Sequence, residues 1–233
     1  MDLHGKKAVV FGGTSGIGLA TCEQLRDRGV AVTAISRNPD KAQGTEGIDL
    51  AACDVRDIDA LTALFTSLAP FDILISAATG GERAIGPFLD MDLPAYQGAF
   101  DKLWGYTNVV HAGAPHLAED GAIVLVSGAP ARKARPGQIA LASVGAAVEQ
   151  FARTVATELV PKRINVVSPG LISTPMFGND AQQRDQALGA ATANFPIPRP
   201  GRSDEVAQAI VFAVENDYIT GTTIDVDGGW LLS

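Results

Sequence analysis

Short apolar runs alternate along the chain with longer segments that have helical spacing. The short runs are typical of buried strands, and they lie at residues 6–12, 30–36, 48–54, 71–78, 122–128, 163–170 and 222–229. The longer segments predict helices, at residues 15–29, 57–68, 94–117, 138–159 and 203–216, the last with Ser203 as its N-cap. Strands that alternate with helices predict an α/β fold, a doubly wound parallel sheet with helices on both faces.

One segment, residues 173–202, follows neither pattern, because it is rich in Pro, Gly, Asn and Gln. At about 30 residues it is too long for a simple connection and is typical of a lid or binding loop. Its apolar residues Met176, Phe177 and Phe195, without an evident clamp for an anion, favour an apolar substrate. No repeat or linker interrupts the chain, so residues 1–233 are predicted to form a single domain that carries this loop.

The composition narrows the possible partners. Of 233 residues, 46% are hydrophobic and 19% are charged, which is typical of a globular domain. The net charge of −8 argues against nucleic acid as a partner, and the basic cluster Arg132, Lys133 and Arg135 is too short for such a surface. No apolar stretch approaches the ~20 residues that cross a bilayer, so no membrane partner is predicted. The chain begins without a signal-peptide pattern, and we expect a cytoplasmic protein.

Neither the cysteines nor the histidines predict a metal site. Cys22 and Cys53 lie far apart in no metal-like spacing, which favours a reducing compartment without a disulfide. His111 and His116 are five positions apart on a predicted helix, so they do not share a face and are expected at the surface.

The sequence "GGTSGIG" (residues 12–18) stands between the first predicted strand and the first helix. Its glycines leave room for a pyrophosphate against the helix N-terminus, where backbone N–H groups and the dipole favour anions. A tight turn without a ligand is the alternative. The second strand ends in Ser36 and Arg37, where an acidic residue would bind the ribose of NAD. An arginine there pairs instead with the 2′-phosphate of NADP, unless it is only a solvated cation.

Four motifs occur in a characteristic order: "GGTSGIG", "DILISAATG", "RINVVSPGLISTPM" and "ITGTTIDVDGGW". They resemble, in that order, the TGxxxGxG loop, the D-x-L-V-N-N-A-G strand, the R-V-N-x-V-x-P-G-x-x-x-T segment and the TGxxxxVDGG segment of short-chain dehydrogenases/reductases. The resemblance covers essentially the whole chain and implies a Rossmann fold that binds NADP(H). It implies cofactor contacts at Gly12, Thr14, Ser15, Gly16, Ile17, Gly18, Ser36, Arg37, Asp54, Val55, Ala77, Ala78, Pro169, Gly170, Ile172 and Thr174.

The residues that carry the chemistry of the resembling family are absent from this chain. In that family a tyrosine donates the proton, a lysine lowers its pKa, a serine orients the substrate and an asparagine completes a water relay. Aligned through "AAVEQFARTVATEL", these positions fall on Leu141, Gly145, Gly128 and Lys102. The chain is therefore predicted to be a divergent member without the Ser, Tyr and Lys. Lys102 is the candidate replacement, since it is expected to extend into the space freed over Gly145. A side chain that points to solvent or caps nearby carbonyls is the alternative.

Other polar residues near these positions are weaker candidates. Lys133 and Arg135 are expected at the rim where a substrate would enter. Ser127 precedes the expected serine by one residue, so alternation along the strand turns its side chain the other way. Tyr96 and Tyr106 are expected in the core or at an interface.

These observations predict an NADP-dependent oxidoreductase that acts on a small, apolar carbonyl or alcohol with a non-standard proton donor. A catalytically silent NADP(H)-binding protein, either a sensor or a partner subunit, is the alternative, and a non-redox reaction such as isomerisation is a third. Resembling proteins pair through their long helices, which predicts a homo-oligomer, dimer or tetramer, through residues 94–117 and 138–159. Small residues on the second segment allow close helix approach, at Ala140, Ala142, Ala146 and Ala147.

Overall fold

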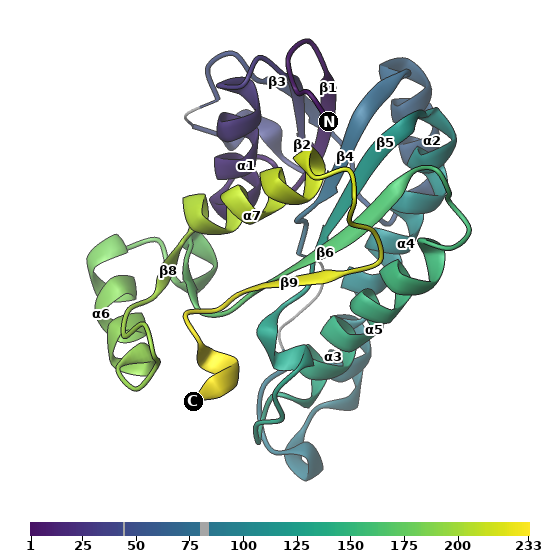
Figure 1. The fold of residues 1–233 in the computed structure, drawn as a ribbon. Helices are drawn as coiled ribbons and strands as arrows, with labels where there is room; N and C mark the ends of the chain where they lie inside the picture. Colours follow the sequence, from purple (N-terminus) through teal and green to yellow (C-terminus); the bar gives the residue numbers. More distant parts are fainter. Residues whose placement is uncertain (44, 80–83) are drawn as a thin grey trace.

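A computed structural model describes residues 1–43, 45–79 and 84–233. Its centre is a seven-stranded parallel sheet with the order β3-β2-β1-β4-β5-β6-β9 (Figure 1). The strands are β1 (Lys7–Phe11), β2 (Ala31–Ser36), β3 (Asp49–Ala52), β4 (Phe71–Ser76), β5 (Leu117–Val126), β6 (Arg163–Pro169) and β9 (Thr223–Val226). The strand order reverses between β1 and β4, which is the point where open sheets of this kind bind ligands at the carboxyl ends of their strands.

Helices cover both faces of the sheet, as predicted (Figure 1). One face carries α1 (Gly16–Arg26) and α7 (Ser203–Glu215), and the other carries α2 (Ile58–Leu68), α4 (Asp101–Gly113) and α5 (Ile139–Val155). Because side chains alternate along a strand, Val10 joins the core cluster on the α1 side, while Val9 and Phe11 join the cluster on the α5 side. The predicted doubly wound α/β fold is confirmed. No helix in the described part of the chain is long and apolar enough to cross a membrane.

The predicted helix over residues 94–117 is wrong in its extent. The structure has α3 (Leu93–Ala99), then α4, then a short 3₁₀ turn η3 (Ala114–His116), and β5 already begins at Leu117. The break falls at Phe100, whose N–H donates to the Gln97 carbonyl at 3.0 Å in a tightened last turn. Gly98, a weak helix former, lies in that turn, and Pro115 lacks the N–H that a continued α4 would need.

Helix α7 begins one residue away from the expected cap. Ser203 is its first helical residue, and Arg202 occupies the N-cap position. The Arg202 N–H donates to Glu205 Oε2 at 2.8 Å, so the helix start is fixed by a glutamate that reaches back from the first turn.

The segment over residues 173–202 contains regular structure that its composition did not predict. It holds the 3₁₀ turn η5 (Pro175–Phe177) and the helix α6 (Ala181–Thr192), and a two-stranded pair of β7 (Ile172–Ser173) and β8 (Gly201–Arg202) brings its ends together. Helix α6 buries only Leu188 and Thr192, so it has no apolar stripe for a sequence pattern to detect. Short 3₁₀ turns elsewhere are η1 (Pro39–Lys41), η2 (Phe88–Asp90), η4 (Ala129–Ala131) and η6 (Trp230–Leu232).

Candidate functional site

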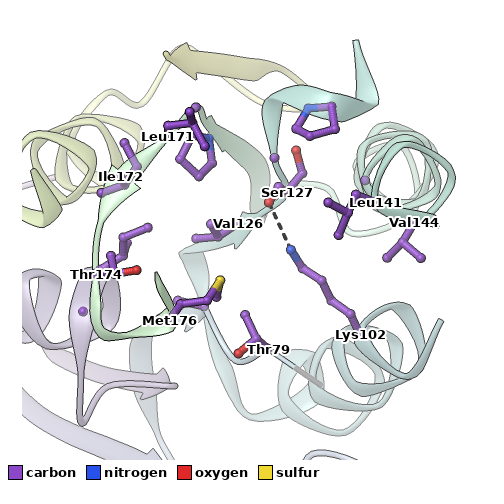
Figure 2. Close-up of a pocket in the computed structure, with 18 of the residues that line it drawn as sticks. Thr79, Lys102, Val126, Ser127, Leu141, Val144, Leu171, Ile172, Thr174 and Met176 are labelled. Carbon is purple, nitrogen blue, oxygen red and sulfur yellow. Dashed lines mark hydrogen bonds between the residues drawn. The ribbon is translucent and has the colours of Figure 1, made fainter. Parts of the chain in front are cut away.

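A cavity of about 530 Å³ opens at the carboxyl ends of the central strands. One wall is the loop after β1 with the start of α1, and the opposite wall is formed by α4, α5 and the loop between β5 and α5. The segment after β6 closes a third side (Figure 2). The predicted site residues that line this cavity are Gly12, Ser15, Gly16, Ile17, Gly18, Ala77, Lys102, Pro169, Gly170, Ile172 and Thr174.

Glycines shape the β1–α1 wall because no side chain fits there. A Cβ on Gly12 would lie 2.8 Å from the carbonyl carbon of Ala77, and φ at Gly12 is +76°. A Cβ on Gly18 would overlap the carbonyl oxygen of Gly12. Ser15, the N-cap of α1, makes no capping bond with its side chain. No side chain of these glycines therefore covers the N-terminus of α1, where first-turn N–H groups attract anions in general.

The remaining predicted cofactor residues, Thr14, Ser36, Arg37, Asp54, Val55 and Ala78, lie outside the lining of this cavity. Two of them continue the same edge of the sheet, since Ser36 ends β2 and Asp54 follows β3 by two residues. The side chain of Arg37 is exposed. Ser36 Oγ is buried without a hydrogen-bond partner among the described residues.

The four positions aligned with the family's catalytic residues come together in the cavity, since Lys102, Gly128, Leu141 and Gly145 all line it. Figure 2 shows Lys102 reaching from α4 to the carbonyl of Ser127, with Leu141 beside it. The Lys102 Nζ–Ser127 O distance is 3.0 Å, and the ammonium lies 5.5 Å from the centre of the Tyr106 ring. The cavity thus holds an ammonium group directly after the end of β5.

The space over Gly145 is not open, which corrects the expected path of the Lys102 side chain. A Cβ on Gly145 would lie 2.9 Å from the Cβ of Ala131 and 3.4 Å from the carbonyl oxygen of Gly128. The turn η4 has therefore closed over the helix at this point, because a glycine permits the approach. The Lys102 ammonium donates instead to the carbonyl of Ser127, directly after β5, which is the alternative that the sequence left open.

Tyr106 lines the cavity, but its hydroxyl is already hydrogen-bonded within the core. Its side chain is fully buried, and its hydroxyl donates to the Val126 carbonyl at 3.0 Å. Burial raises the pKa of this phenol far above its ordinary value, so it holds its proton at neutral pH. Tyr96 does not line the cavity, and its hydroxyl donates to Ser143 Oγ at 3.3 Å.

The hydroxyl of Ser127 is also occupied by a buried hydrogen bond. Its hydroxyl donates to Glu149 Oε1 at 2.9 Å, and both side chains are buried. Glu149 does not line the cavity, so the Ser127 side chain is directed into the body of α5 while its carbonyl serves Lys102. Burial raises the pKa of the Glu149 carboxyl, and the hydrogen bond from Ser127 opposes part of that rise.

The outer end of the cavity contains a residue that sequence reasoning missed. Trp230 lines it, is 5% exposed and packs against Phe195 and Ala129. Phe195, expected to meet the substrate, therefore supports this indole and does not line the cavity, whereas Met176 and Phe177 do line it. The signal for Trp230 was its place directly after Gly228 and Gly229, whose positive φ angles turn the chain back to the site.

Comparison with known proteins places this architecture in a family. Residues 12–231 match the family described as "Enoyl-(Acyl carrier protein) reductase". The chain is 32% identical to carbonyl reductase family member 4 of Danio rerio, over 95% of this chain and 96% of that protein. The chain belongs to the short-chain dehydrogenase/reductase family.

Two solved structures are similar over nearly the whole chain. A small-chain dehydrogenase in complex with NADPH has a TM-score of 0.85 and 32% identity, covering 98% of this chain and 99% of its own. A short chain oxidoreductase from Pseudomonas aeruginosa PAO1, with NADPH bound and described as containing an atypical catalytic center, has a TM-score of 0.87 and 29% identity, covering 97% and 96%.

Proposed function

We propose that this chain is an NADP(H)-dependent oxidoreductase that acts on a small, largely apolar carbonyl or alcohol. The glycine wall, with its Cβ-free surface against the N-terminus of α1, supports a bound dinucleotide. NADPH in two similar solved structures supports the choice of cofactor. Apolar side chains from α5 and the segment after β6 support an apolar substrate body, namely Leu141, Val144, Leu171, Met176 and Phe177.

Different residues of the chain would hold different parts of the cofactor. The first turn of α1 would hold the pyrophosphate, Ser36 and Arg37 the 2′-phosphate, and Asp54 with Val55 the adenine. Pro169, Gly170, Ile172 and Thr174 would hold the nicotinamide end. When bound, NADPH supplies a hydride to the substrate carbonyl carbon.

Lys102 is the proposed proton donor, and its place in the cavity is the observation that carries the proposal. Its ammonium group lies beside Leu141, the position of the family's tyrosine, while the hydroxyls of Tyr106 and Ser127 are occupied by other partners. The Ser127 carbonyl fixes the ammonium at one of its three N–H groups. As negative charge develops on the substrate oxygen, Lys102 stabilises it and transfers a proton to it, and solvent reprotonates the amine.

The test is Lys102→Met, with turnover and NADPH affinity measured separately. We expect NADPH-linked reduction to fall by about 10²–10⁴-fold, the usual effect of losing a general acid. Lys7→Met is the control, since Lys7 is exposed at the start of β1, at the opposite end of the strand. Wild-type turnover in Lys102→Met would remove the assignment.

A silent NADP(H)-binding protein is the second candidate, and the apolar residues at the catalytic positions favour it. Leu141, Gly145 and Gly128 offer no proton donor. Loss of the reduced nicotinamide absorbance with a panel of ketones, aldehydes and quinones separates the two functions, because a silent protein binds NADPH tightly and consumes none.

A homo-oligomer through residues 94–117 and 138–159 is part of the same proposal. Trp104 supports it, because this large apolar side chain on α4 is 62% exposed. Sedimentation at micromolar concentration tests it, and a monomer would exclude it. The cytoplasmic location stays a prediction.

A further inference from the structure

The charge of the cavity is opposite to that of the chain around it. The chain has 26 acidic and 18 basic residues. Among the described residues that line the cavity, the charged ones are Lys102 and Arg135, and none is acidic. Two cations and, among the described residues, no acid line this cavity in an otherwise acidic chain, so the cavity favours an anion.

Arg135 is the cation that the surrounding residues leave available. Its neighbours on the same loop are engaged, since Arg132 pairs with Asp225 at 2.9 Å and Lys133 donates to the Trp230 carbonyl at 2.8 Å. No salt bridge of the described residues includes Arg135. Its guanidinium lies 4.9 Å from the centre of the Trp230 ring. Stacking of this kind holds the planar group in place with its N–H donors open to a ligand.

Gln138 adds a second polar group next to this arginine. Its backbone N–H donates to the Arg135 carbonyl at 3.3 Å, so the two residues belong to one turn. Its side chain lines the cavity, and the amide oxygen Oε1 is buried without a partner among the described residues. Rotation of the amide by half a turn exchanges its donor and acceptor, so the side chain offers either to a ligand.

The cofactor does not account for Arg135. The proposed site of the 2′-phosphate is at the end of β2, and Arg135 follows β5. Strands β1 and β4 lie between them in the sheet, a separation of about 14 Å at the usual strand spacing. The pyrophosphate wall follows β1, which is two strands away from β5 in the sheet, about 10 Å at the same spacing.

Building on the proposed function, we propose that the substrate is an oxo acid whose carboxylate binds Arg135. Its carbonyl lies at Lys102, its apolar segment packs against Leu141 and Met176, and its carboxylate meets the guanidinium on Trp230. A carboxylate fits because the planar fork of an arginine donates two parallel hydrogen bonds to it. Gln138 completes the carboxylate subsite with its amide N–H.

The experiment compares levulinate and its longer homologues, each beside its methyl ester, in wild type and Arg135→Gln. We expect wild type to prefer the acid and Arg135→Gln to lower kcat/KM for the acid by about 10-fold or more, with the ester unchanged. Arg28→Gln is the control, because it removes the same charge from an exposed site outside the cavity. Equal rates for acid and ester in wild type, or equal losses for both in Arg135→Gln, would overturn the inference.

A binding measurement separates this inference from the proposed function. With saturating NADP⁺, calorimetry should detect hexanoate and not hexanamide, and Arg135→Gln should weaken hexanoate about 10-fold. Arg135-dependent hexanoate binding without reduction of any carbonyl compound would keep the anion subsite and reject the oxidoreductase. Reduction of esters without hexanoate binding would do the reverse. Much tighter binding of hexyl phosphate than of hexanoate would overturn the choice of a carboxylate.

Discussion

The two walls of the cavity are built from different parts of the chain. The β1–α1 wall is backbone, made possible by Gly12 and Gly18, at which a Cβ would collide with neighbouring backbone. The α4–α5 wall is formed by side chains, among them Leu141 and Lys102. A site formed by closely packed backbone requires glycine at particular positions, because any other residue would bring a Cβ into contact with that backbone. A side-chain site admits substitution, and its chemistry changes with each one.

The largest effect that would sharpen this comparison is expected from Gly18→Ala. The added Cβ would overlap the Gly12 carbonyl oxygen, so the first turn of α1 would have to move away from the loop. We expect NADPH affinity to fall more than ~100-fold, the loss of several charge-assisted bonds, measured by fluorescence titration. Gly98→Ala is the matched control, since a Cβ there meets nothing within 4 Å. Unchanged NADPH binding in Gly18→Ala would show that the wall is not the cofactor site.

A smaller effect is expected from Arg37→Ala, which changes a side chain beside the backbone wall. An exposed arginine that pairs with the 2′-phosphate contributes about 10-fold to 150-fold to NADPH affinity and almost nothing to NADH affinity. Titration of both cofactors checks this, with Arg28→Ala as the control for net charge. Equal losses for NADPH and NADH would break the prediction.

The smallest effect is expected from Glu149→Gln, behind the side-chain wall. Burial raises the pKa of this carboxyl above its ordinary value of 4.5. The folded chain therefore binds the proton more tightly than the unfolded chain, and stability rises as the pH falls through the folded pKa toward 4.5. Removing the charge should make the variant more stable at mildly alkaline pH, by about 1 kcal/mol or less.

Urea unfolding from mildly alkaline to mildly acidic pH measures this difference, which should shrink toward acid. Asp225, whose pKa burial also raises, and Arg132 influence Glu149 and remain in both proteins. Glu158→Gln is the control, because Glu158 is exposed and lies three residues beyond the end of α5. A difference that does not change with pH would contradict the prediction.

The sequence predicted the fold and the placement of the glycine wall because both depend on patterns with few alternatives. Alternating strands and helices determine a doubly wound sheet, and the glycines at 12, 16 and 18 occur where a phosphate needs open backbone. Helix α6 escaped prediction because it buries too little, and the break at Phe100 because it depends on local turn geometry. Trp230 escaped because it reaches the cavity from the far end of the chain.

The contact between Gly145 and Ala131 restricts which side chains this part of α5 can accept. A lysine introduced at 145 alone would force its Cβ against Ala131, and a tyrosine introduced at 141 alone would have no such lysine beside it. A designer who wishes to graft the tyrosine and lysine would have to open residue 131 first, for example with a glycine. A single methyl group, the Cβ of Ala131, thus decides the order in which such substitutions would have to be made.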